Sequence, residues 1–214
     1  MSKPQKSRMM PIVLAFVSAV GLVVAAFGPR WLADPDHAKV GFGLTTFEEC
    51  ITDSTCKSGS IADLLDKIDL EIAQIEKRNE TLLPSEQISP PKKPWRGFPV
   101  VGMIAFIGSL VAAGGLIAGG AFAAANKRPA VPVLPTTIAV LGLMFAIVTG
   151  CVFVATKPAA VQSMEVGWSF FVFGGAIVTS LIAVFPLNRL IRPIDEELGE
   201  GSATMSWSAE LDKL

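Results

Sequence analysis

The chain alternates between long apolar stretches and polar connections. Four stretches carry no charged side chain, and they cover residues 9–27, 98–125, 136–155 and 166–186. A helix of about 20 residues crosses a hydrocarbon core of about 30 Å, and each stretch reaches that length within a residue or so. The pattern predicts four membrane-spanning helices, so the expected fold class is an all-α membrane protein built as a four-helix bundle.

The first apolar stretch also has features of a cleaved signal peptide. Lys3, Lys6 and Arg8 precede it, and Val24-Ala25-Ala26 is a passable cleavage site. A signal peptide usually has an apolar core of about 7–15 residues, which is shorter than this stretch. We therefore expect residues 9–27 to be retained as the first span.

Residues 28–97 form one large polar region between the first and second spans. Its segment 40–47 is rich in β-branched and aromatic residues with glycines, which predicts short strands. Cys50 and Cys56 follow, and a disulfide between them would stabilise the loop by ~2 kcal/mol in the chain-entropy model. Two free thiols in a reducing compartment are the alternative.

An amphipathic helix is predicted after the cysteines, with Ser60 as its N-cap and Asp63 in the first turn. Its apolar stripe must be covered, because an isolated helix of this length is marginal in water. Docking within the chain is the leading interpretation. The alternatives are that the helix lies along the membrane or pairs with a partner helix. The stripe consists of Ile61, Leu65, Ile68, Ile72 and Ile75.

Positive charges set the expected orientation, since short cytoplasmic loops retain lysine and arginine. They place residues 1–8, the loop 126–135 and the acidic tail 187–214 in the cytoplasm. The large loop 28–97 and the short loop 156–165 then lie outside. Lys92, Lys93 and Arg96 oppose this arrangement, but they end a long loop, where the rule weakens. Three tryptophans, Trp31, Trp95 and Trp168, fall on one predicted face and resemble half of an aromatic belt.

Composition narrows the function classes. The chain is 51% hydrophobic and only 17% charged, which is too apolar for an ordinary soluble domain. A net charge of −1 argues against a nucleic-acid surface. One histidine and three cysteines are too few for most metal sites built from soft ligands. We therefore predict no cofactor, no metal and no catalytic residue.

The spans contain no ionisable residue, which argues against an ion or proton pathway made by this chain alone. They contain small residues at four-residue intervals, which let helix backbones approach closely in lipid. These faces either pack within one bundle or bind other subunits. The residues concerned are Ala15 and Ala19 in the first span, Gly115 and Gly119 in the second, and Gly142, Ala146 and Gly150 in the third.

The layout resembles the claudin superfamily, which includes the peripheral myelin proteins and the auxiliary subunits of AMPA-type glutamate receptors. Trp31, Gly43-Leu44, Cys50 and Cys56 match the family's loop signature in order, although Thr45 stands where the family has a second tryptophan. The resemblance implies a left-handed four-helix bundle capped by a small extracellular sheet. It also implies roles in lateral assembly, adhesion or modulation of a larger membrane complex.

The leading hypothesis is a non-catalytic multi-pass membrane protein whose partners are the lipid bilayer and other membrane subunits or itself. It would be an accessory or assembly subunit, or a claudin-like adhesion component. One alternative is a small transporter or channel component, with the glycine-rich stretch 98–125 lining a shared path. Another is a membrane enzyme or cofactor carrier using the cluster Asp34, Asp36, His37, Glu48 and Glu49.

Overall fold

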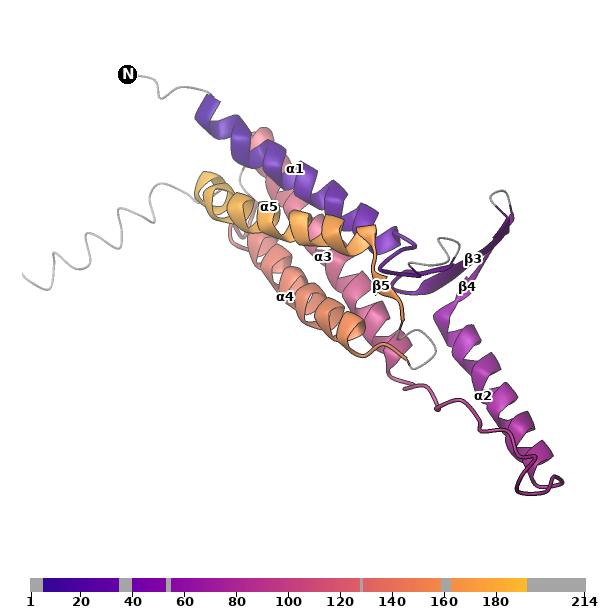
Figure 1. The fold of residues 1–214 in the computed structure, drawn as a ribbon. Coiled ribbons are helices and arrows are strands. Elements are labelled where there is room, and N and C mark those ends of the chain that lie inside the picture. Colours follow the sequence, from indigo (N-terminus) through magenta and orange to yellow (C-terminus); the bar gives the residue numbers. More distant parts are fainter. Residues whose placement is uncertain (1–5, 35–39, 53–54, 128, 159–162, 192–214) are drawn as a thin grey trace, which may run out of the picture.

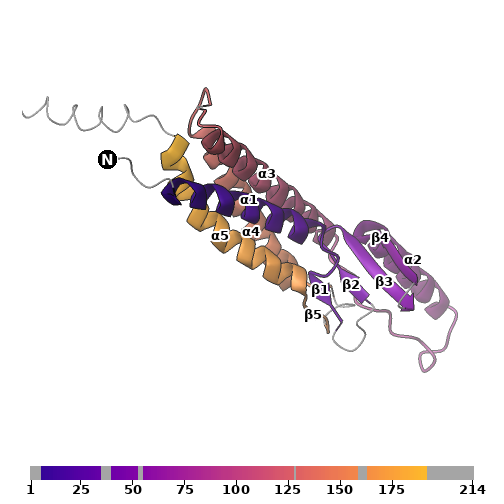
Figure 2. The same ribbon diagram turned by 90° about the horizontal axis from the view of Figure 1, so that it is seen from above.

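The computed structural model describes residues 6–34, 40–52, 55–127, 129–158 and 163–191. The predicted cytoplasmic tail beyond residue 191 and two members of the candidate acid cluster, Asp36 and His37, lie outside these ranges. The described chain contains long helices joined to a small sheet at one end (Figures 1 and 2). The helices are α1 (Lys6–Phe27), α2 (Ile61–Asn79), α3 (Phe98–Ala124), α4 (Leu134–Ala155) and α5 (Trp168–Ile191).

The prediction of four long apolar helices is confirmed, because α1, α3, α4 and α5 are each long and apolar enough to cross a membrane. The bounds of the last one differ from residues 166–186. Val166 belongs to a strand, and α5 continues through Pro186 to Ile191. Leu187 and Ile191 are fully buried against the other helices, so packing stabilises the turn beyond the proline.

The closest helix packing joins α3 to α4 through glycine and alanine. A Cβ atom built on Gly142 would lie 2.5 Å from the backbone nitrogen of Ala112. A Cβ atom on Gly115 would likewise lie 2.6 Å from the backbone nitrogen of Ala139. The two backbones are therefore in direct contact, as the small-residue spacing predicts for helices in lipid.

The other predicted packing residues are also used within the bundle. Ala15, Ala19 and Ala146 are buried. Gly119 faces Leu187 of α5, and Gly150 faces the ring of Trp31. In α1, the Ser18 hydroxyl donates a hydrogen bond of 2.8 Å to the Thr179 hydroxyl of α5. The small-residue faces thus bind the chain's own helices.

The helices do not close into a complete ring. α3 packs along α4 and α1, and α1 packs along α5, whereas α4 and α5 touch only weakly. The order around the bundle is therefore α4, α3, α1, α5, with an open side between the first and the last. This open side forms a groove along the bundle.

A five-stranded antiparallel sheet lies at the end of the bundle where α1 ends and α5 begins (Figure 2). The short strands predicted near residues 40–47 are present, but the sheet is larger than predicted. The additional strand, at one edge of the sheet, begins at Glu165, the last residue of the predicted loop 156–165. Its second residue, Val166, pairs with Leu32. In sheet order, the strands are β4 (Thr55–Ser60), β3 (Thr46–Thr52), β2 (Val40–Phe42), β1 (Leu32–Ala33) and β5 (Glu165–Val166).

The predicted row of three interfacial tryptophans is wrong for Trp31, which is fully buried. Its ring fills the junction between the sheet and the bundle instead of facing lipid. Trp95, just before α3, and Trp168, at the start of α5, are both about half exposed. They lie at the sheet end of the bundle, where amphipathic rings are typical of a membrane interface.

Candidate functional site: the sheet and the α2 hairpin

Trp31 fixes the sheet to the helices. Its side chain is 0% exposed, and its Nε1 donates a hydrogen bond of 2.6 Å to the carbonyl oxygen of Ala25 at the end of α1. The ring centroids of Phe173 and Phe170 lie 4.9 and 5.7 Å away, and that of Phe153 lies 6.3 Å away. Because buried aromatic rings carry large packing energies, this cluster holds the sheet in one orientation on the bundle.

Gly43 and Leu44 lie in the turn between β2 and β3, which also faces the bundle. The backbone nitrogen of Gly43 donates to the carbonyl oxygen of Thr46 at 2.7 Å. Leu44 is buried, and Gly102 of α3 lies so close to the Leu44 carbonyl oxygen that a Cβ atom there would clash with it. Two of the signature elements, Trp31 and Gly43-Leu44, thus anchor the sheet and are not available as a contact surface.

The Cys50–Cys56 disulfide, as predicted, is formed. The two cysteines pair directly across β3 and β4, in the half of this strand pair that ends at Thr52 and Thr55. Cys56 and the rest of β4 are largely exposed. The bridge therefore holds together a two-stranded ribbon that extends away from the Trp31 junction (Figure 1).

Helix α2 follows β4 and starts where the sequence predicts. The Ser60 hydroxyl accepts a hydrogen bond of 3.2 Å from the backbone nitrogen of Ala62. Ile61 and Leu65 are buried in the main core, and Ile68 is partly buried against it. Ile72 is buried and Ile75 is half-buried further along. The apolar stripe is thus covered mainly within the chain, as the leading interpretation of the sequence expects.

The chain returns from α2 to α3 in a segment that hydrogen bonds to the helix. The Asn79 side chain makes two hydrogen bonds with the backbone of Ile88, donating to its oxygen at 2.6 Å and accepting from its nitrogen at 3.0 Å. Nearer the bundle, Arg96 forms an ion pair of 2.6 Å with Asp69. We call residues 61–96 the α2 hairpin, since these contacts join its two arms.

The α2 hairpin extends beyond the end of the four long helices (Figures 1 and 2). Most of its exposed side chains are charged or polar, but several large apolar ones are also exposed. Leu70, in the middle of α2, is 64% exposed, and Leu83, just beyond the helix, is 66% exposed. Ile88 and Trp95 on the return arm are about half exposed. Exposed apolar side chains outside the membrane-type helices are candidates for protein contacts.

The candidate acid and metal residues do not form a ligand set among the described residues. Glu48, Cys50 and Cys56 have potential ligand atoms within 4.8 Å of one another. Both cysteine sulfurs are joined in the disulfide, so neither is a thiolate able to bind a metal. Glu49 lies between Glu48 and Cys50 on β3, and Asp34 directly follows β1.

Sequence reasoning missed three features of this region. The sequence pattern assigns Glu165 to the short loop 156–165 and Val166 to the last span, whereas both form strand β5, whose pairing with β1 extends the sheet toward α5. The lysine in that loop, Lys157, donates a hydrogen bond to the carbonyl oxygen of Met164 and helps to close it. The Asn79–Ile88 contact was also missed, because nothing in the spacing of two loop residues predicts which backbone group an asparagine will bind.

Comparison with known proteins finds no matching protein-family model and no matching curated sequence.

Proposed function

We propose that this chain is a non-catalytic multi-pass membrane protein that acts through protein–protein contacts of its sheet and α2 hairpin. Its role is that of an accessory or assembly subunit of a larger membrane complex, or of a claudin-like adhesion component. The observation that carries the proposal is the α2 hairpin itself: an internally braced extension that exposes Leu70 and Leu83 outside the four long helices.

Insertion in a bilayer is the first part of the proposal. The outward faces of the four long helices are covered with large exposed apolar side chains. Contact between these side chains and water would be unfavourable in free energy. On α1 they recur along one face of the helix, and α3, α4 and α5 also carry several each. The α1 residues are Met9, Met10, Val13, Val17, Val20, Val24 and Phe27.

The proposed orientation places the sheet and the α2 hairpin outside and both chain termini in the cytoplasm. The Cys50–Cys56 bridge supports it, because a disulfide is stable in an oxidising compartment. The positive charges of Lys127 and Arg189, at the end of the bundle away from the sheet, also support it.

The resemblance to the claudin superfamily is supported by architecture alone. A small antiparallel sheet at one end of a four-helix bundle is what that resemblance implies. The signature positions Trp31 and Leu44 are buried where the sheet meets the helices. In such an arrangement the bundle positions the sheet, and the outer elements that it leaves exposed contact the partner.

The test is the mass of the assembly after extraction in mild detergent. Leu70→Lys replaces an exposed apolar side chain of α2 by a charged one, and Gln74→Lys, one turn further along and also exposed, is the matched control. We expect the native protein and Gln74→Lys to migrate in an assembly larger than one chain, and Leu70→Lys to shift toward the single chain. Migration of all three as single chains, or selective solute flux through the purified chain in liposomes, would overturn the proposal.

A further inference from the structure

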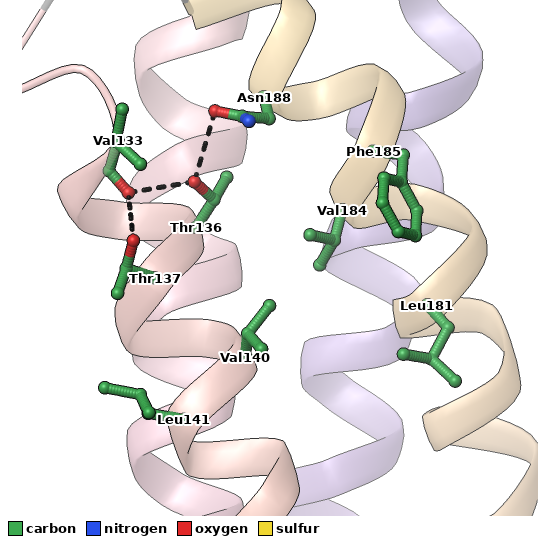
Figure 3. A pocket seen from close by; sticks show the side chains of 9 residues that line it. All are labelled: Val133, Thr136, Thr137, Val140, Leu141, Leu181, Val184, Phe185 and Asn188. Carbon is green, nitrogen blue, oxygen red and sulfur yellow. Dashed lines mark hydrogen bonds between the residues drawn. The ribbon is translucent and has the colours of Figure 1, made fainter.

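The open side of the bundle contains a groove with a polar end. It lies between α4 and α5 in the half of the bundle away from the sheet, and its volume is about 390 Å³. Its walls are apolar, with Val140 on α4 facing Val184 on α5 and with Leu141, Leu181 and Phe185 as further lining residues (Figure 3). A cavity of this size is within the range of small-molecule sites.

Two polar side chains close one end of the groove, at Thr136 and Asn188 (Figure 3). The Thr136 hydroxyl lies 2.9 Å from the carbonyl oxygen of Val133 and 3.3 Å from Asn188 Oδ1, so it donates to one of them at a time. The Asn188 NH2 group donates no hydrogen bond within the described residues. Asn188 is half-buried, so its amide donor lies at the edge of an apolar wall, and this end of the groove favours a ligand that brings an acceptor.

The depth of the polar end indicates what kind of ligand fits. Asn188 directly precedes Arg189, and a charged side chain next to an apolar helix segment is expected at the level of the lipid headgroups. We therefore expect Asn188 to lie near the boundary between hydrocarbon and headgroups, where lipid ester and phosphate oxygens lie. Arg189 and Lys127 are exposed at the same end of the bundle and add positive charge.

We infer that the α4–α5 groove binds one acyl chain of an anionic glycerophospholipid, with an ester or phosphate oxygen accepting from Asn188 Nδ2. The apolar part from Leu181 to Asn188 runs for about 10 Å along the helix, parallel to the chains of the surrounding leaflet. A partner helix is a poorer occupant, because its backbone groups are satisfied internally and would leave the Asn188 amide without an acceptor.

This inference goes beyond the proposed protein contacts, although both require insertion in a bilayer. Variants in the groove distinguish the lipid site from the protein contacts. Leu181→Trp fills the groove from a side chain that is 47% exposed, and Ile182→Trp places the same ring on the neighbouring residue, which is 56% exposed and does not line the groove. Asn188→Leu removes the amide and keeps a side chain of similar size.

The experiment uses the full chain in liposomes containing phosphatidylglycerol with a photoreactive group on one acyl chain. We expect labelled peptides from facing parts of α4 and α5, a loss of about tenfold in Leu181→Trp, no loss in Ile182→Trp, and a loss of about fivefold in Asn188→Leu. The same probe built on phosphatidylcholine should label the groove less, and assembly mass should not change in any variant.

Three results would overturn the inference. The first is uniform labelling of all outward helix faces that Leu181→Trp does not change. The second is equal labelling by the anionic and zwitterionic probes, which would show that the groove does not select an anionic headgroup. The third is a protein crosslinked in the groove in place of the lipid, which would make it a helix-docking surface.

Discussion

Replacement of Gly142 by alanine tests whether α3 and α4 are packed backbone to backbone. The added Cβ would lie 2.5 Å from the Ala112 nitrogen and 2.8 Å from the Gly108 carbonyl oxygen. Both are backbone atoms, so no side-chain rotation relieves the contact. Optimal separation between non-bonded carbon atoms is about 3.5–4.0 Å, which means that the helices must move apart by about 1 Å.

Moving the helices apart lowers the free energy of unfolding. Overpacking a well-packed core usually destabilises by about 1–3 kcal/mol, and for a chain of this size each kcal/mol lowers the melting temperature by about 2–4 °C. We therefore expect Gly142→Ala to lower the melting temperature by about 2–12 °C, measured as the fraction of the protein that stays monodisperse in detergent after heating.

Gly114→Ala on α3 is the matched control, since a Cβ there meets nothing within 4 Å. Alanine is also a better helix former than glycine by up to about 1 kcal/mol in water. We expect this variant to melt at the native temperature or slightly above it. Equal melting temperatures for Gly142→Ala and Gly114→Ala would refute the close packing of α3 on α4.

Three further predictions concern the sheet and the orientation. Trp31→Ala should destabilise by about 3–5 kcal/mol and loosen the sheet, seen as faster hydrogen exchange in β1 and β2; unchanged exchange would contradict the anchoring role. Cys50→Ser should cost ~2 kcal/mol locally, raising exchange in β3 and β4 about thirtyfold without lowering the melting temperature of the helices; a lower bundle melting temperature would contradict this. In a Cys151→Ala background, Glu86→Cys should react with an impermeant maleimide on intact cells and Lys127→Cys only after permeabilisation; the reverse would invert the orientation.

The helices could be predicted because their signals are local. Each long apolar run is a property of consecutive residues, and the 3.6-residue period of α2 is visible from Ile61 onward. The disulfide was predictable for the same reason, since Cys50 and Cys56 are close in sequence. Even the glycine spacing on α3 and α4 indicates close packing, although it does not say which helix lies opposite.

The rest depends on tertiary contacts that have no local signal. Glu165 and Val166 form a strand only because Leu32 and Ala33 lie beside them, more than a hundred residues earlier in the chain. Pro186 looks like a helix end, yet burial of Leu187 keeps the helix intact beyond it. In the sequence Trp31 resembles an interfacial residue, whereas in the fold three phenylalanine rings enclose it.

The groove between α4 and α5 could not be predicted from the sequence for a further reason. It exists because those helices are neighbours in sequence but pack on different partners, α4 on α3 and α5 on α1. Thr136 and Asn188 are ordinary polar residues near the ends of apolar runs, and only the fold brings them together.

Photocrosslinking from residue 70 in intact membranes tests the central claim most directly. A photoreactive side chain in place of Leu70 samples whatever contacts the α2 hairpin, and one in place of Phe171, exposed on α5, serves as the comparison at the helix surface. We predict a discrete protein adduct from position 70, either with a second copy or with another membrane protein, and lipid adducts from position 171. Lipid adducts alone from position 70, or no adduct there while position 171 reacts, would contradict the account.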